Sequence, residues 1–190
     1  MSEPINVEFS SLRDHFLVAM PGLVDGIFTG SVTYMCEHDE EGAMGIVINR
    51  PTSLVFSDLF EDRLDIIESR QDLTIVAGGP VQVDRGLILH DGEKHWDSTM
   101  ELPNGLKLTT SNDIIEAIAR GEGPENFLVA LGYAGWGPGQ LEDEIINNAW
   151  LNTPADKAMI FQTPFEKRAV AALAQLGIDY NLISSQAGHA

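Results

Sequence analysis

The stretch LVALGYAGWGPGQLEDE, residues 128–144, is the clearest indication of how this chain folds. The apolar run Phe127–Leu131 predicts a strand, and Pro138 fits the first turn of a following helix, where its missing N–H does no harm. Between them, large aromatic side chains are set among glycines. This arrangement predicts a shaped, chain-specific turn rather than a generic linker.

Two interpretations of this turn stay open. Glycine most often marks a special backbone angle, which favours a structural turn with an aromatic anchor. The alternative is a small-molecule or partner pocket around Tyr133, Trp136 and Gln140. A phosphate-binding loop is disfavoured, because no lysine or serine follows the glycines and the acidic residues 142–144 would repel a phosphate.

Elements on either side of this stretch follow from hydrophobic periodicity. Short apolar runs predict strands at residues 16–20, 31–36, 43–49, 73–77, 86–90, 106–109, 157–162 and 178–183. Helices are expected at residues 54–64, after the N-cap candidate Ser111, from Pro138 onward and at 164–176. Residues 37–42 are expected to form a hairpin loop, 91–105 a loop or hairpin around Trp96, and 184–190 a loose tail. Strand pairs come early and helices late, with no repeat or linker, which predicts one α+β domain over residues 1–190.

Composition indicates a soluble globular protein. The chain has 190 residues, of which 44% are apolar, enough for a sizeable core. No apolar run approaches the roughly 20 residues that a membrane-spanning helix needs, and the N-terminus lacks the pattern of a secretory signal. The single cysteine, Cys36, excludes an intrachain disulfide framework. We therefore expect a cytoplasmic protein.

The charge balance argues against direct binding of nucleic acid. The chain has 29 acidic residues against 11 lysines and arginines, a formal charge of -18, and the basic residues are scattered. Nucleic-acid affinity depends strongly on several Lys or Arg contacts to phosphates. A surface this acidic repels a duplex from most directions of approach.

Cys36, Glu37 and His38 suggest a thiol–imidazole pair, since residues i and i+2 of an extended strand share a face. A nucleophilic cysteine needs a base or positive charge that favours its thiolate. The acidic run 39–41 would instead raise the pKa of the thiol. A half-buried structural cysteine is the favoured interpretation.

Other candidate sites rest on single residues. Arg50, before Pro51 at a strand end, could contact an anion in a pocket, but an ion pair with a neighbouring carboxylate is favoured in so acidic a chain. The histidines do not match a familiar zinc spacing, so no metal site is expected. No serine-hydrolase elbow, phosphate loop or dinucleotide fingerprint occurs, and no cofactor is predicted.

Taken together, the motifs resemble the YqgE/AlgH family of bacterial proteins. The resemblance is carried, in order along the chain, by residues 15–21, 31–38, 45–51, 78–81, 85–90 and 132–151. It implies an α+β fold in which a bent, branching β-sheet forms a pseudo-barrel flanked by helices. It implies no catalytic residues, and it implies a transcriptional regulator only as a label that some members carry.

Three functions follow as hypotheses. The first is a non-enzymatic protein that binds a protein partner or a small ligand and influences gene expression indirectly. Its candidate binding residues are Tyr133, Trp136, Gln140, Arg50, Cys36 and His38. The alternatives are a regulator that binds DNA directly and an enzyme that uses Cys36, with His38 or His90 as the base.

Overall fold

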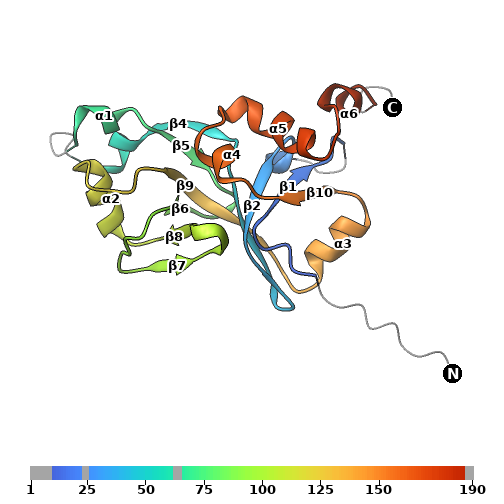
Figure 1. The fold of residues 1–190 in the computed structure, drawn as a ribbon, viewed down its shortest axis with the longest axis horizontal. Coiled ribbons are helices and arrows are strands. Elements are labelled where there is room, and N and C mark those ends of the chain that lie inside the picture. Colours follow the sequence, from blue (N-terminus) through green and yellow to red (C-terminus); the bar gives the residue numbers. More distant parts are fainter. Residues whose placement is uncertain (1–9, 23–25, 62–65, 187–190) are drawn as a thin grey trace.

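Strand β9 (Phe127–Trp136) is the central element of the computed structural model, which describes residues 10–22, 26–61 and 66–186. Its first half pairs with β6 (Val81–His90) and, in parallel, with β5 (Thr74–Ala77). Its last residues pair with β3 (Gly42–Val47), so β9 links two parts of one sheet (Figure 1). The sheet therefore branches at the middle of β9.

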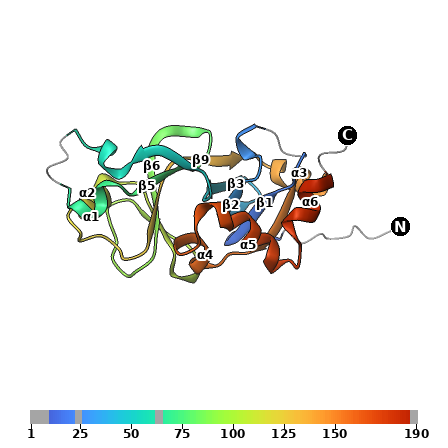
Figure 2. The same ribbon diagram turned by 90° about the horizontal axis from the view of Figure 1, so that it is seen from above.

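The remaining strands extend the sheet to both sides. The order is β10-β1-β2-β3-β9-β6-β8-β7, with β4 and β5 off this path, and every pairing except β5–β9 is antiparallel. These strands are β1 (His15–Ala19), β2 (Val32–Asp39), β4 (Pro51–Val55), β7 (Thr99–Glu101), β8 (Lys107–Thr109) and β10 (Trp150–Pro154). The result is a curled half-barrel, the bent and branching sheet that was expected (Figure 2).

Helices cover this sheet from several sides. The α-helices are α1 (Glu68–Gln71), α2 (Asn112–Ala119), α3 (Gln140–Ile146), α4 (Lys157–Phe161), α5 (Arg168–Gln175) and α6 (Tyr180–Gln186). Single 3-10 turns are η1 (Gly26–Phe28), η2 (Phe56–Leu59), η4 (Pro103–Gly105) and η5 (Phe165–Lys167). In Figure 1, α1 and α2 lie at one end, α3 at the other, and α4 and α5 between them.

Three clusters of buried side chains correspond to these positions. The largest joins Phe16, Tyr34 and Leu128 to residues of α4 and α5. A second packs beneath α2, and a third packs beneath α3 around Trp136 and Trp150. The α+β class and the branched half-barrel are therefore as expected.

Glycines permit the branch because backbones approach closely there. A Cβ on Gly79, whose φ is +154°, would lie 2.1 Å from the carbonyl carbon of Tyr133. A Cβ on Gly132, whose φ is +71°, would lie 2.5 Å from the carbonyl oxygen of Gly79. Only glycine fits where these segments cross. Residues 132–136 are thus strand rather than the predicted turn, and the turn itself is residues 137–139.

Several predictions of local structure were wrong at the C-terminal end. Residues 157–162, predicted as a strand, form helix α4, because the Asp156 carboxylate accepts the Ala158 N–H at 2.9 Å and caps it. Residues 178–183, also predicted as a strand, belong largely to α6, and residues 184–186 of the predicted tail continue that helix. Residues 187–190 lie outside the described residues. Strand β10 was missed, because Asn152 and Pro154 interrupt its apolar pattern.

Four predictions at other places need correction. Residues 51–55 pair with β5 as a strand, so the predicted helix at 54–64 is reduced to a 3-10 turn, and residues 62–65 lie outside the described ones. The hairpin expected to loop over 37–42 turns instead at Glu40 and Glu41. Residues 91–105 contain a short strand that pairs with β8. Pro138 lies in the turn before α3 rather than in its first turn.

Candidate functional site

Trp136 and Gln140, two of the predicted site residues, belong to a closed network under α3. The indole N–H groups of Trp136 and Trp150 both donate to Oε2 of Glu144, at 2.9 Å and 2.7 Å. The Gln140 amide donates to Oε1 of the same carboxylate at 3.0 Å, and its own oxygen accepts the Gly137 N–H. We call these residues, Trp136, Gln140, Glu144 and Trp150, the indole–carboxylate network.

This network joins the turn to the sheet rather than forming a binding cavity. The two indole rings contact edge to face with centroids 5.9 Å apart, and Phe28 packs against both. Both tryptophans are buried. Because the Glu144 carboxylate already accepts three hydrogen bonds, its main role is to hold α3 against the strands. The structural interpretation of the glycine–aromatic segment therefore agrees with the geometry.

His38 strengthens the same attachment from strand β2. Its Nδ1 accepts the Leu12 N–H at 2.9 Å, so the proton of the neutral ring is on Nε2, which lies 2.8 Å from Oε1 of Glu142. The side chain of His38 is buried. Both ring nitrogens thus have partners.

Cys36 lies on the other face of the sheet from His38. A β-bulge between Met35 and Glu37 breaks the alternation of the strand, so that Cys36 packs with Leu87 and Leu108, the same residues that line a groove beside Glu37. The expected sharing of a face by Cys36 and His38 is therefore wrong. The Cys36 side chain is completely buried, and burial raises the pKa of its thiol, which disfavours the thiolate.

Tyr133 and Arg50 lie apart from these groups. Tyr133 is three residues from Trp136 along β9 and so faces the opposite side of the sheet, where it lines an open groove with Met44, Met100 and Arg85. Arg50 donates to the carbonyl oxygen of Thr29 at 2.6 Å, and the expected ion pair with a carboxylate is not seen within the described residues. The six predicted residues do not converge on one cavity.

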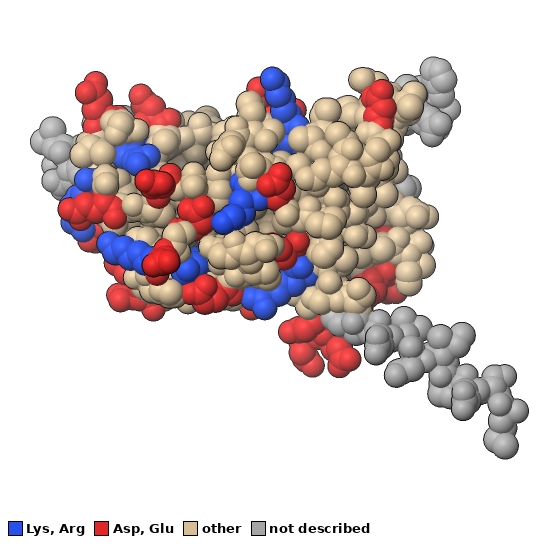
Figure 3. All heavy atoms as spheres, viewed as in Figure 1, with Lys and Arg blue, Asp and Glu red and all other residues tan. Residues whose placement is uncertain are grey.

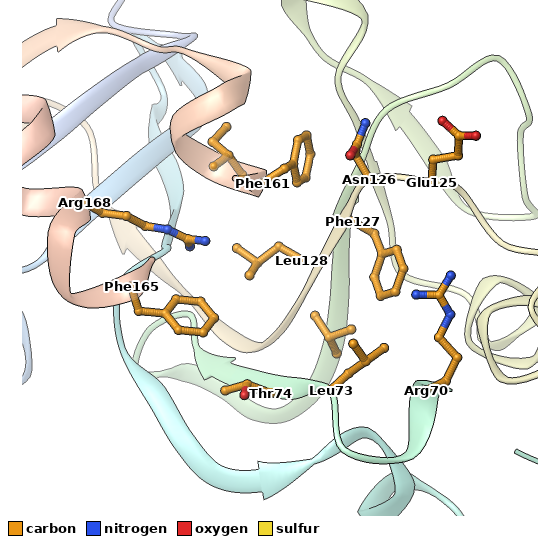
Figure 4. Close-up of a pocket in the computed structure, with 12 residues that line it drawn as sticks. Arg70, Leu73, Thr74, Glu125, Asn126, Phe127, Leu128, Phe161, Phe165 and Arg168 are labelled. Carbon is orange, nitrogen blue, oxygen red and sulfur yellow. The ribbon is translucent and has the colours of Figure 1, made fainter. Parts of the chain in front are cut away.

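A different pocket, of about 350 Å³, is lined by a buried arginine, Arg168. It opens between α4 and α5 on one side and β5, α1 and the start of β9 on the other. Figure 4 shows its labelled lining: Arg70, Leu73, Thr74, Glu125, Asn126, Phe127, Leu128, Phe161, Phe165 and Arg168. We call it the two-arginine pocket.

Arg168 is 4% exposed, although arginine is rarely buried without a carboxylate. Its Nε donates to the carbonyl oxygen of Thr163 at 2.9 Å, and its Nη1 donates to that of Ile48. Its guanidinium carbon lies 4.4 Å from the ring centroid of Phe165, and burial lowers its pKa to about 10. No ion pair to Arg168 occurs in the described part of the chain. The cation is thus fixed in place but not neutralised.

Arg70 lies across the pocket from Arg168 (Figure 4). Its guanidinium carbon lies 5.2 Å from the ring centroid of Phe127. Its Nε is buried without a hydrogen-bond partner, and within the described residues its side chain has no ion pair. The pocket therefore combines two guanidinium groups, aromatic faces and apolar walls, a composition suited to a small anion.

Sequence reasoning missed this pocket because its residues come from three separate stretches of the chain, 70–74, 125–129 and 160–168. One signal was nonetheless present. Arg168 lies on the same helical face as Ala172, one turn later, which is the apolar face of the predicted helix 164–176. A cation among the apolar positions of an amphipathic helix needs a partner or a function.

Charged side chains of both signs are mixed on the surface (Figure 3). On the face shown in Figure 3, the lysines and arginines lie among acidic side chains, and the described residues there form no continuous basic area. No group of three metal-ligating side chains occurs within the described residues. None of the helices described in the structure combines the length and the apolar character needed to cross a membrane.

Comparisons with known proteins agree with this fold. The family model described as AlgH-like matches residues 16–181. A UPF0301 protein of Saccharophagus degradans is 52% identical over 96% of this chain and 91% of its own length. A UPF0301 protein of Thioalkalivibrio sulfidiphilus is 54% identical over 95% of this chain and 98% of its own length.

Two solved structures are similar. The solution structure of the AlgH protein from Pseudomonas aeruginosa has a TM-score of 0.79 and 47% identity, and the match covers 100% of this chain and 99% of that one. A crystal structure of a Corynebacterium diphtheriae protein has a TM-score of 0.66 over 85% of this chain and 84% of that one. At 20% identity, the second supports the fold alone.

Proposed function

The chain belongs to the AlgH-like family, and we propose that this member is a non-enzymatic, cytoplasmic protein that binds a small anionic molecule in the two-arginine pocket. One observation carries the proposal. The buried guanidinium of Arg168 lines a cavity without a carboxylate to neutralise it among the described residues.

The physical argument concerns the free energy of a buried cation. Removing a charged group from water is costly unless hydrogen bonds and an opposite charge compensate. Two backbone carbonyls supply hydrogen bonds to Arg168, but neither supplies a negative charge. An anion in the pocket supplies one, and a guanidinium offers it parallel N–H donors.

The lining favours binding over covalent chemistry. Its residues in the described chain include one carboxylate, Glu125, and no cysteine or histidine. The alternative nucleophile, Cys36, is inaccessible to solvent and has a raised thiol pKa. A ligand-binding protein can influence gene expression through its occupied and empty states, so an indirect regulatory role requires no contact with DNA.

Thermal melting in the presence of small anions tests the proposal. At constant ionic strength we expect phosphate or a carboxylate, compared with chloride, to raise the Tm in a saturable manner. A ligand at one hundred times its Kd stabilises the folded state by about 2.7 kcal/mol, which for a domain of this size corresponds to roughly 5–10 °C.

Variants locate the effect. Arg168→Lys keeps a positive charge but loses the forked donors and should weaken binding, while Arg120→Gln removes an exposed arginine elsewhere and should leave it unchanged. Should Arg168→Lys fold poorly, backbone NMR of the unmodified protein gives the same information, with shifts expected at Thr74 and Phe165. If no anion changes the Tm or these signals, the proposal is wrong.

The cysteine alternative has its own test. Cys36 should react with an alkylating reagent more slowly than a free thiol at neutral pH, because it is buried. Reaction faster than that of a free thiol would support the enzyme hypothesis instead.

A further inference from the structure

We infer that the ligand of the two-arginine pocket carries anionic groups at both ends, as a short dicarboxylate does, with Arg168 holding one end and Arg70 turning to hold the other. The inference rests on the proposed function and narrows it to a class of ligand. It follows from the different states of the two arginines and from the apolar surface between them.

Arg168 forms the fixed end. Two of its nitrogens already donate to backbone carbonyls, and its guanidinium lies against the ring of Phe165. The side chain is therefore held in one orientation, with its third nitrogen, Nη2, without a hydrogen-bond partner in the described chain. Figure 4 shows the guanidinium directed toward Leu128 and the space of the pocket.

Arg70 forms the adjustable end. It is half-exposed, and its described contact is with the ring of Phe127. Its buried Nε has no acceptor, an arrangement that proteins normally avoid because such a donor has lost its hydrogen bond to water. An anionic group near Phe127 would give Arg70 a charge-assisted bond that the ring does not provide.

Apolar side chains separate these two ends. Leu73 and Leu128 lie between the arginines in Figure 4, with Phe161 on one side. A charged group in the middle of the ligand would lose water there without gaining a partner. A volume of about 350 Å³ is near the lower end for ligand pockets, so the molecule is small.

Glu125 raises an alternative class of ligand, because its exposed carboxylate also lines the pocket. An α-amino acid could pair its carboxylate with Arg168 and its ammonium group with Glu125. That ligand would leave Arg70 unsatisfied, whereas a molecule with two anionic ends satisfies both arginines. Amino acids therefore serve as the competing class in the test.

Isothermal titration calorimetry with matched ligands provides that test. The probes are the dicarboxylates succinate, glutarate and adipate, the monocarboxylates butyrate, pentanoate and hexanoate with the same carbon numbers, 3-phosphonopropionate, and norvaline, the α-amino derivative of pentanoate. We expect the best dicarboxylate or the phosphonocarboxylate to bind at least tenfold more tightly than its monocarboxylate, since a hydrogen bond to a charged group has this magnitude.

Arg70→Gln is the decisive variant, and Arg120→Gln is its control with the same change of charge. Arg70→Gln should weaken binding of the two-ended anion about tenfold and reduce the preference over the monocarboxylate to less than threefold. The control should preserve both. In the unmodified protein, the Arg70 Nε–H signal should shift and exchange more slowly with water when the two-ended anion binds.

The outcomes separate the two proposals. If monocarboxylates bind as tightly as two-ended anions, or Arg70→Gln leaves the preference intact, this inference is wrong while the anion pocket stands. Tighter binding of norvaline than of glutarate, lost in Glu125→Gln, would also overturn it in favour of an amino acid. If none of these anions binds at all, both proposals fail.

Discussion

The indole–carboxylate network and the two-arginine pocket differ in whether their charged groups have partners. In the network, the Glu144 carboxylate accepts three hydrogen bonds and the neighbouring Glu142 meets His38. In the pocket, Arg168 has only neutral acceptors and Arg70 has only an aromatic ring among the described residues. In this acidic chain, therefore, key acids serve structure, and two cations are left available for a ligand.

Charge alone consequently does not indicate function in this protein. With a formal charge of -18, the acidic residues dominate the composition, yet the most informative group is a buried arginine. A group whose hydrogen bonds and charge are both satisfied stabilises the fold. A group with a remaining requirement points to a binding partner.

The largest expected effect tests the structural role of the network. Trp136→Ala removes a buried indole and leaves a cavity, so the free energy of unfolding should fall by about 3–5 kcal/mol. Urea denaturation measures the change. Trp136→Phe, which keeps most of the ring, should lose less, and a stable Trp136→Ala protein would contradict the anchoring role.

A smaller loss is expected when only the acceptor changes. Glu144→Gln keeps the shape but removes the charge that two indole N–H groups share, and it should cost about 1–3 kcal/mol. The matched control is Asp143→Asn on the same helix, an exposed position where substitutions usually change stability by less than about 0.5 kcal/mol. Equal effects of the two variants would show that Glu144 has no special role.

A titration of protein stability against pH tests a third region, around the buried His90, separately from the indole–carboxylate network and the two-arginine pocket. Burial lowers the pKa of His90, so the folded state holds the neutral ring while the unfolded chain takes up a proton below about pH 6.5. Stability should therefore be full above this pH and fall as the solution becomes more acidic. Arg168 stays charged in this range, because its pKa is about 10, so affinity for a carboxylate should be constant from about pH 6.5 to 8.5.

His90→Gln provides the control for this titration. It should flatten the fall in stability below about pH 6.5 that arises from the buried ring. An unchanged curve would assign the pH dependence to other groups.

The smallest effect concerns Arg70 in the absence of ligand. Because its side chain is half-exposed and lacks a hydrogen bond or ion pair within the described residues, Arg70→Gln should change the free energy of unfolding by less than about 0.5 kcal/mol. Chemical denaturation checks this value. A loss comparable to that of Glu144→Gln would mean that Arg70 is structural, and the contrast between the two regions would fail.

Prediction of secondary structure from sequence succeeded where the apolar pattern of one segment determines whether it forms a strand or a helix. The strands around Leu17, Val47 and Val76 and the helix after Ser111 were confirmed, since their apolar patterns are continuous. It failed at Lys157–Phe161, where a short apolar run fits a strand or a buried helix equally well. It failed again at β10, which forms only because β1 offers it an edge.

The same distinction between local pattern and contacts of distant segments applies to the candidate site residues. Trp136 and Gln140 lie together, because both side chains donate to the Glu144 carboxylate, and their role in binding stays a prediction. Tyr133 was grouped with them wrongly, because a strand places it on the opposite face. In a strand, side chains alternate between the two faces of the sheet, but this rule was not applied because the segment was interpreted as a turn.

The sequence by itself determined the family, the α+β class and an acidic surface with scattered cations, because periodicity, motif order and composition are local or additive properties. Only the tertiary structure decided that Arg70 and Arg168, 98 positions apart in the numbering (168 minus 70), share one pocket. The reason is that burial and hydrogen-bond satisfaction depend on which distant segments meet. No single segment contains that information.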